Sequence, residues 1–270
     1  MQGPSRAAAV HSREAFAGVL AAGADPARLA QELFAVVGVL DGSLTLRRAV
    51  VDPSREGADR AALVGGLFGG KVAPSTLEML ESVVSQRWSF ERDLSDTIES
   101  CGIEAVIASA EMDNRADRVE DELFRFERIV AADPELQMAL TQADAPTEKR
   151  ADLADSLLRG KVAEETLALV RQAVIAPRGR RFDATIETYL DIASTRRQMQ
   201  TATVTSAMPL TDADTSRLVT ALASIYGGKI HLNAVVDPRV IGGIRVEIGD
   251  EVIDGTILRK LEGARRAMDA

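Results

Sequence analysis

The chain has 270 residues, of which 46% are hydrophobic and 27% charged, and its formal net charge is −9. This composition is typical of a soluble globular protein with one to three domains. The acidic balance argues against a basic face for nucleic acid or anionic lipid. The single cysteine, Cys101, allows no disulfide within the chain and fits a reducing compartment.

Membrane insertion is not expected. No segment approaches the roughly 20 consecutive apolar residues of a spanning helix. The N-terminus, Met1 to Val10, lacks the long apolar stretch of a signal peptide. We therefore expect any link to a membrane to run through partner proteins.

The sequence resembles itself at an offset of 90 residues, with a slip of two residues around Asp41 and Asp133. Chance supplies scattered alanine matches but not whole blocks held in register, so we interpret the pattern as a duplicated domain. The matching blocks include Glu14-Ala15 with Glu104-Ala105, Glu32-Leu33-Phe34 with Glu122-Leu123-Phe124, Arg60-Ala61 with Arg150-Ala151, and Gly70-Lys71-Val72-Ala73 with Gly160-Lys161-Val162-Ala163.

Each copy has the periodicity of a small helical bundle. Apolar residues recur in steps of three and four, which places them on one face of a helix. Asp133-Pro134 and Thr147 are typical helix starts, and Gly70 and Gly160 are typical helix ends. We expect five or six short helices per copy. The two faces are Leu29, Leu33, Val36 and Leu40, and Val119, Leu123, Phe126 and Val130.

The junction between the copies lacks the composition of a linker. Its apolar residues form one stripe at helical spacing, so we expect a helix, straight or kinked, to run from the first bundle into the second. Cys101 lies on this stripe and is interpreted as a small buried hydrophobe. The stripe comprises Phe90, Leu94, Ile98, Cys101, Ala105 and Ala108.

After about residue 197 the pattern changes to an α+β module. Thr201–Ser206 is β-prone, and Thr211–Tyr226 reads as a helix that Thr211 and Asp214 start as a capping box. The stretches 230–236 and 244–248 alternate as half-buried strands do. Asp254 is expected to cap a last helix whose apolar face is Ile257, Leu261, Ala264 and Met268.

These elements predict a mainly α protein with a small α+β C-terminal domain. Two tandem six-helix-type bundles, at residues 1–101 and 102–197, precede a βαββα module at residues 198–270. Element boundaries of this kind carry an error of a few residues.

The segment Gly65–Lys71 has the Gly-to-Gly-Lys spacing of a phosphate-binding loop. Val72 stands where that loop needs Ser or Thr to bind Mg²⁺, and the preceding segment is predicted to be a helix instead of a strand. We interpret the stretch as a helix end with flexible glycines.

Other polar groups also have structural explanations. His11 and His231 lack the neighbouring ligands that a metal site needs. The remaining charged clusters are interpreted as solvated, although the arginines could contact an acidic partner. No catalytic residue, cofactor site or metal site is therefore predicted, and the protein is not expected to be an enzyme. The charged clusters are Glu120-Asp121-Glu122 and Arg178, Arg180 and Arg181.

One stretch, Val236–Thr256, closely resembles the C-terminal signature of the δ subunit of F-type ATP synthase. In mitochondria this family is called the oligomycin-sensitivity-conferring protein. The second helical copy, from about Ile103 to Thr195, is similar to that family's N-terminal six-helix domain. The signature residues, interpreted as structural, are Pro238, Gly242, Gly243, Gly249, Asp254 and Gly255.

The resemblance implies a stator subunit that links the catalytic head to the peripheral stalk, so that rotor torque is coupled to ATP synthesis. It also implies one copy per complex, held peripherally at the cytoplasmic face of the bacterial membrane through the complex. A groove between the first and fifth helices of the second copy would hold an N-terminal helix of an α subunit. The candidates there are Ala105, Ala108, Leu167, Val170 and Val174. For the C-terminal ends of the b subunits the candidates are Leu258, Leu261 and Arg265.

The extra first copy departs from the usual family pattern and resembles longer forms found in actinobacteria. It could bind a second α helix, brace the stalk, or only lengthen the subunit. The alternative function is a helical adaptor of another cytoplasmic assembly, which would make the C-terminal signature a coincidence. A nucleotide-binding enzyme is a third hypothesis, against which Val72 counts.

Overall fold

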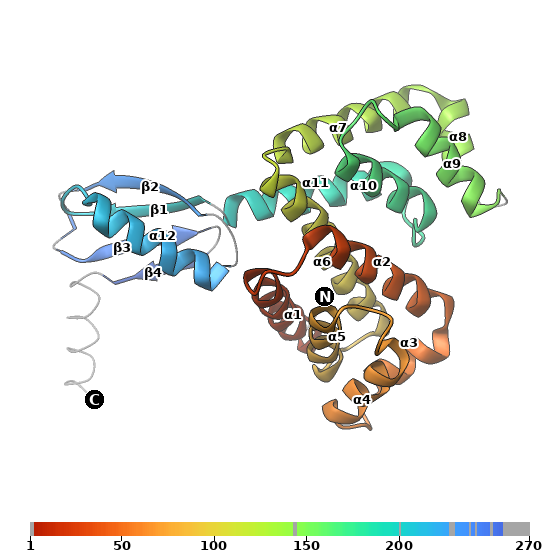
Figure 1. The fold of residues 1–270 in the computed structure, drawn as a ribbon, viewed down its shortest axis with the longest axis horizontal. Coiled ribbons are helices and arrows are strands. Elements are labelled where there is room, and N and C mark those ends of the chain that lie inside the picture. The colour runs from red at the N-terminus through yellow and green to blue at the C-terminus, as the bar shows by residue number, and fades with distance from the viewer. Residues whose placement is uncertain are drawn as a thin grey trace. The chain divides into compact units, whose positions relative to one another are not determined.

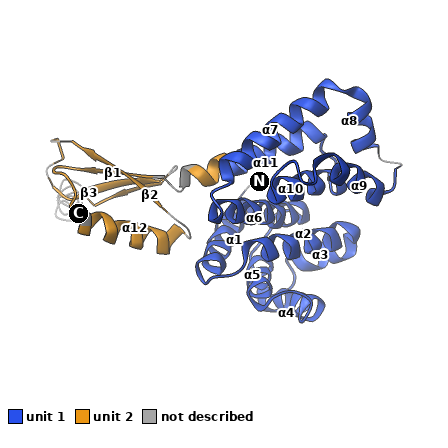
Figure 2. Ribbon diagram, turned by 45° about the horizontal axis from the view of Figure 1, so that its top comes forward, with its two compact units in different colours: residues 1–193 blue, residues 194–270 orange. Residues whose placement is uncertain are grey.

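The computed structural model describes residues 3–142, 145–199, 201–226, 230–237, 239–240, 242–248 and 251–255. Over these residues the chain is helical up to residue 199 and then forms a small mixed sheet with one further helix (Figure 1). It divides into two compact units, residues 1–193 and 194–270 (Figure 2). The predicted fold class, mainly α with a small α+β C-terminal domain, is confirmed.

The helices of the first unit repeat at a constant offset of 90 residues. The slip predicted around Asp41 and Asp133 is wrong, because Ser43 caps α3 as Asp133 caps α8, and these two residues are 90 apart. The helices are α1 (Pro4–Ala21), α2 (Pro26–Gly42), α3 (Leu44–Val51), α4 (Gly57–Phe68), α5 (Pro74–Ser85), α6 (Glu91–Met112), α7 (Ala116–Ala132), α8 (Pro134–Thr141), α9 (Thr147–Leu158), α10 (Glu164–Ile175) and α11 (Phe182–Met199).

Local signals account for several helix ends. Asp25 and Asp133 accept hydrogen bonds from the first free N–H groups of α2 and α8, each of which begins with proline. Thr147 begins α9 as predicted but does not cap it, because Pro146 holds the cap position. The stretch with phosphate-loop spacing is the end of α4, and Gly70 beyond it has a φ of 72°.

Helix α6 belongs to both copies. It is the sixth helix of the first bundle and, at the offset of 90 residues, the counterpart of α1 in the second. Its residues are buried on every side, whereas the sequence suggested a single stripe. Phe90 is an exception to that stripe, because it precedes the helix and is 62% exposed. Both bundles consequently share one hydrophobic core.

Burial also explains the chemistry of Cys101. The residue is 1% exposed within α6, and burial raises the pKa of its thiol well above the usual range. The thiol therefore stays protonated and packs as a hydrophobe, as predicted.

The duplicated glutamates Glu32 and Glu122 make the same three contacts in the two copies. Glu122 accepts hydrogen bonds from the N–H of Ala163 at 2.9 Å, the hydroxyl of Thr166 at 2.6 Å and the guanidinium of Arg118 at 2.7 Å. The carboxylate, which belongs to α7, thereby provides a hydrogen-bond acceptor for the start of α10, where backbone N–H groups have no partner within the helix. The prediction that Glu122 is solvated is wrong, since its side chain is only 13% exposed.

In the first copy the same bonds run to Glu32 from Ala73, Thr76 and Arg28. Burial raises the pKa of both carboxyls, but these hydrogen bonds lower it more, so each pKa lies below its usual value.

A buried ion cluster joins the two copies. Arg178, in the loop after α10, pairs with Asp41 of α2 at 2.7 Å and with Glu99 of α6 at 2.7 Å. It also pairs with Asp96, whose pKa burial raises in spite of the nearby Arg178. Arg180 binds the second oxygen of Glu99. The side chains of Arg178 and Glu99 are 4% and 2% exposed, so interpreting Arg178 as solvated was wrong.

The second unit is built on a four-stranded sheet with strand order β2-β1-β3-β4. Strand β1 (Thr201–Ser206) runs parallel to β2 (His231–Val236) and antiparallel to β3 (Ile244–Ile248), which pairs with β4 (Glu251–Asp254). Helix α12 (Asp212–Tyr226) connects β1 to β2, and Thr211 caps it through the N–H of Asp214 as predicted. The core of the second unit consists of Ala202, Val204, Leu222, Ile230, Val246 and Ile248.

Two strands differ from the sequence expectation. Strand β2 lies at the edge of the sheet, and its Ala234 and Val236 are exposed where alternation predicted burial. Residues 251–254 form a strand that the sequence did not predict, and Asp254 lies opposite Arg245 in it. The predicted last helix lies outside the described residues.

Replacing Glu122 with Gln should lower the free energy of unfolding by about 1–3 kcal/mol at pH 7, because the buried N–H and hydroxyl donors lose a charged acceptor. Since the pKa of Glu122 is lower in the folded chain, its carboxylate stabilises the fold above the unfolded pKa. That stabilisation is lost as the pH falls through the folded pKa. Urea denaturation at pH 7 and in acid should show a smaller pH dependence for Glu122→Gln than for the wild type. Glu32→Gln, with the same contacts, should behave alike, and a neutral effect of both would contradict the explanation.

Arg178→Met should cost about 3–5 kcal/mol of unfolding free energy, because Glu99 is left buried without its main counter-charge. Adding Glu99→Gln to that variant should recover part of the loss. Arg181→Met is the matched control in the same loop, since that side chain is 77% exposed and should change stability by less than about 0.5 kcal/mol. Equal stabilities of the Arg178 and Arg181 variants in urea would show that the cluster does not hold the copies together.

Candidate functional site

The five groove residues predicted in the second copy are buried. Ala105, Val170 and Val174 are at most 1% exposed, and Ala108 and Leu167 are 5% and 8% exposed. All except Ala108 belong to the common core of the first unit. Their role in binding a partner stays a prediction. In this structure Val174 lines a cavity of about 250 Å³ near Phe182, and Leu167 lines a separate, open cavity.

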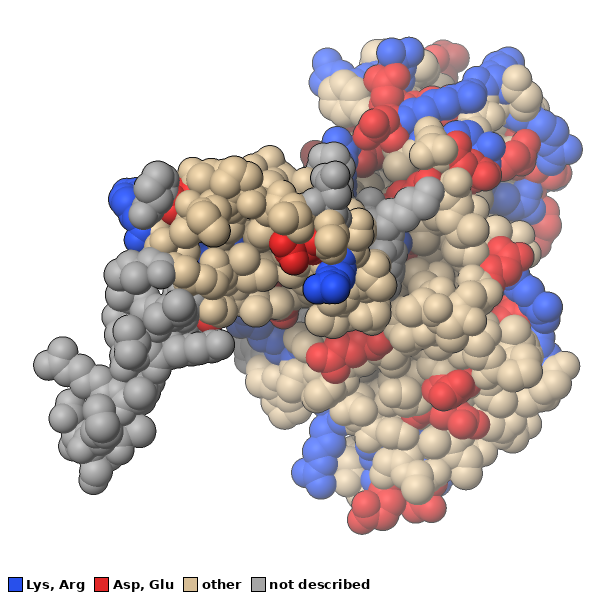
Figure 3. Space-filling model, turned by 60° about the vertical axis from the view of Figure 1, so that its left-hand side comes forward, with Lys and Arg blue, Asp and Glu red and all other residues tan. Residues whose placement is uncertain are grey.

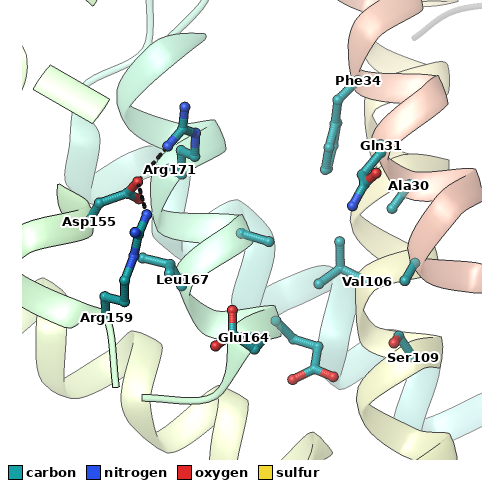
Figure 4. Close-up of a pocket in the computed structure, with 13 residues that line it drawn as sticks. Ala30, Gln31, Phe34, Val106, Ser109, Asp155, Arg159, Glu164, Leu167 and Arg171 are labelled. Carbon is teal, nitrogen blue, oxygen red and sulfur yellow. Dashed lines mark hydrogen bonds and ion pairs between the residues drawn. The ribbon is translucent and has the colours of Figure 1, made fainter. Parts of the chain in front are cut away.

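That cavity is a groove of about 320 Å³ between the two copies (Figure 4). Helix α10, with Leu167 and Arg171, forms one wall, and α2, with Phe34, lies opposite; Val106 belongs to α6. The groove residues are Ala27, Ala30, Gln31 and Phe34 of α2, Val106 and Ser109 of α6, Asp155 of α9 and Arg159 directly after it, and Glu164, Glu165, Leu167, Ala168 and Arg171 of α10.

Helices α6 and α10, the equivalents of the first and fifth helices of the second copy, both line the groove, but the wall opposite α10 comes from α2, and the residues of α6 differ from those predicted. Val106 and Ser109 each follow directly after a predicted residue, Ala105 and Ala108. The wall from α2 was not predicted. A signal for it existed in the repeat, because α2 is uncharged at positions where α7 carries acids.

Charges surround the apolar part of the groove. One oxygen of Asp155 accepts hydrogen bonds from both Arg159 and Arg171, each at 2.7 Å (Figure 4). Glu165 binds Arg115 at 2.6 Å, and this hydrogen bond raises the pKa of the guanidinium. The remaining oxygens, Oδ1 of Asp155 and Oε2 of Glu165, are buried and have no hydrogen-bond partner among the described residues. Both carboxylates belong to residues that line the groove.

Gly102 lets Phe34 approach α6 closely. A Cβ built on Gly102 would lie 2.7 Å from Cε1 of Phe34, which is closer than real side chains come. The glycine thus fixes where the aromatic ring of the α2 wall lies.

The C-terminal unit has a second cavity of about 590 Å³ between the end of β1 and α12. Gly242 and Gly243 line it and have positive φ angles of 130° and 80°. The surface of this unit that faces the viewer in Figure 3 is largely uncharged. The large exposed apolar residues in the described part of the C-terminal unit are Met208, Ile225, Val235, Val236, Val252 and Ile253.

Several predicted residues lie outside the described residues. These are the stalk candidates Leu258, Leu261 and Arg265 and the signature residues Pro238 and Gly249. Gly255, also of the signature, donates its N–H to the carbonyl of Ile244 at 3.0 Å.

No group of three or more metal-ligating side chains occurs in the described part of the chain. No single helix among these residues is long and apolar enough to cross a membrane; α2 and α3 meet the criteria only as a pair, across a bend of 108°.

Comparison with known proteins identifies the family. The model of the ATP synthase delta (OSCP) subunit family matches residues 103–268. A protein named ATP synthase subunit delta from Kineococcus radiotolerans is 44% identical over 92% of this chain and 90% of its own length. The protein of that name from Streptomyces coelicolor is 41% identical over 99% of this chain and 98% of its own.

These relatives match the extra first copy as well as the part that the family model covers. Membership also makes the chain a peripheral component of a membrane-bound complex that synthesises ATP. The chain therefore belongs to the ATP synthase delta (OSCP) subunit family.

Proposed function

We propose that this protein is the stator subunit of a bacterial F-type ATP synthase and has no catalytic activity of its own. It binds N-terminal helices of the α subunits through its helical unit and the C-terminal ends of the b subunits through its C-terminal unit. One copy sits at the cytoplasmic face of the membrane and keeps the catalytic head from turning with the rotor. The observation that carries the proposal is the open groove at α6 and α10 in a member of the delta family.

The shape and lining of the groove suit a helix. Two helices form its walls, and Ala168 and Leu167 leave a narrow apolar strip between charged residues. An amphipathic helix that binds a groove of this kind inserts one row of side chains and keeps its polar face in water. With about 320 Å³, the cavity is large enough for such a row and too small for a whole helix.

The C-terminal unit supports the stalk contact. Its exposed apolar residues, among them Met208 at 74% and Val252 at 48%, provide surface that a partner would bury. We propose that the b subunits bind this unit, with Leu258, Leu261 and Arg265 among the contacts.

Calorimetric titration of the full chain with a synthetic peptide of the cognate α subunit's N-terminal helix tests the proposal. Ala168→Trp, which fills the groove from an exposed position of α10, should weaken binding by at least about tenfold, or 1.4 kcal/mol. The matched variant is Glu78→Trp, at the equivalent exposed position of α5 in the first copy, and it should leave the affinity unchanged.

The opposite result, loss of binding in Glu78→Trp alone, would move the α site to the first copy. If the peptide does not bind the wild type and the chain captures no b subunit, the stator proposal fails. Point variants are needed because α6 begins at Glu91, so a truncated chain starting near residue 103 would lack part of a shared helix.

A further inference from the structure

The α2 wall of the groove comes from the extra copy, which the family model does not cover. Residues Ala27, Ala30, Gln31 and Phe34 follow one face of α2 at helical spacing. Ala30 is 2% exposed and Gln31 is exposed, so the wall runs from the shared core to the groove mouth. A partner in this groove would contact both copies.

The internal repeat shows what this face looks like without a neighbouring copy. Ala27, Ala30 and Gln31 correspond to Asp117, Glu120 and Asp121 on α7. Phe34 corresponds to Phe124, which is 55% exposed. The α7 face carries acids, as expected at the end of a repeat array. The α2 face is uncharged and its residues at two of these positions are alanines, which leaves space for the side chains of a partner.

The opposite side of the groove supplies unused acceptors. Glu165 is 6% exposed, and its Oε2 finds no hydrogen-bond partner among the described residues; the same holds for Oδ1 of Asp155. A buried acceptor without a donor is costly, so an occupant that brings a donor is favoured over an entirely apolar one. Because both oxygens belong to carboxylates, a lysine or arginine is the best complement.

We propose that the first copy forms the second wall of the partner groove and that the occupant is a basic amphipathic helix held between α2 and α10. Its row of apolar side chains lies between Phe34 and Leu167, and a lysine or arginine beside that row reaches Glu165 and Asp155. The inference rests on the proposed function, in which this helix belongs to an α subunit. The extra copy accordingly helps to bind the α subunit and, through it, the catalytic head.

A pair of variants at equivalent positions of the repeat tests the α2 wall. Gln31→Trp places an indole at the groove mouth, whereas Asp121→Trp places it on the solvent face of α7; both native residues are exposed. Each variant is titrated with the α-subunit peptide described above, and circular dichroism checks that each folds. We expect at least about tenfold weaker binding for Gln31→Trp and wild-type affinity for Asp121→Trp.

The outcomes separate this inference from the proposed function. Weakened binding in both Gln31→Trp and Ala168→Trp supports a groove formed by both copies. Weakened binding in Ala168→Trp alone keeps the stator proposal and overturns the contribution of α2. No binding of the peptide to the wild type overturns this inference, and the stator proposal fails with it only if the chain also captures no b subunit.

Glu165→Gln tests the charge complementarity, since glutamine keeps an acceptor for Arg115 and removes the charge. Binding of the peptide should weaken by about tenfold at low salt and by less at high salt. A Glu148→Gln variant, at an exposed position of α9 outside the groove, is the control and should retain the affinity. Equal affinities of the two variants at both salt concentrations would overturn the basic character of the occupant.

Discussion

The guanidinium group of Arg178 connects three of the helices that line the groove, namely α2, α6 and α10. It binds Asp41 near the end of α2 and Glu99 in α6, and it follows the end of α10 directly. The groove residues of α2 lie between Ala27 and Phe34 and those of α10 between Glu164 and Arg171, so they lie before the ends of these helices that Arg178 joins. The two walls are therefore tied together at one end and open at the other. A buried charge network of this kind favours one geometry over many, because any other arrangement leaves charges unpaired.

Much of the fold was accessible from the sequence because its signals are local. Proline and aspartate mark the starts of α2 and α8, alternation marks β3, and the match at 90 residues marks the duplication. The buried charges were not accessible in the same way, because residue type alone predicts exposure. For Glu122 a signal existed, since Glu32 occupies the same place in the other copy. For Arg178 none did: its counterpart in the repeat is Trp88.

The binding site stays a prediction. Resemblance to the family pointed to the first and fifth helices of the second copy, and of the five residues predicted there Leu167 lines the groove between the copies. The side formed by α2 depends on how one bundle packs against the next, which hydrophobic periodicity does not encode. The same limit applies to β2, whose alternation suggested burial on one face. Its place at the sheet edge is a property of strand order, so Val236 is 47% exposed.

The sharing of α6 has a mechanical consequence. Helix α6 is part of both bundles, so a continuous hydrogen-bonded helix joins them instead of a flexible linker. A force applied to one bundle is therefore transmitted to the other through α6, with little deformation of the connection. In the stator role proposed above, this connection would make the extra length that the duplication adds stiff.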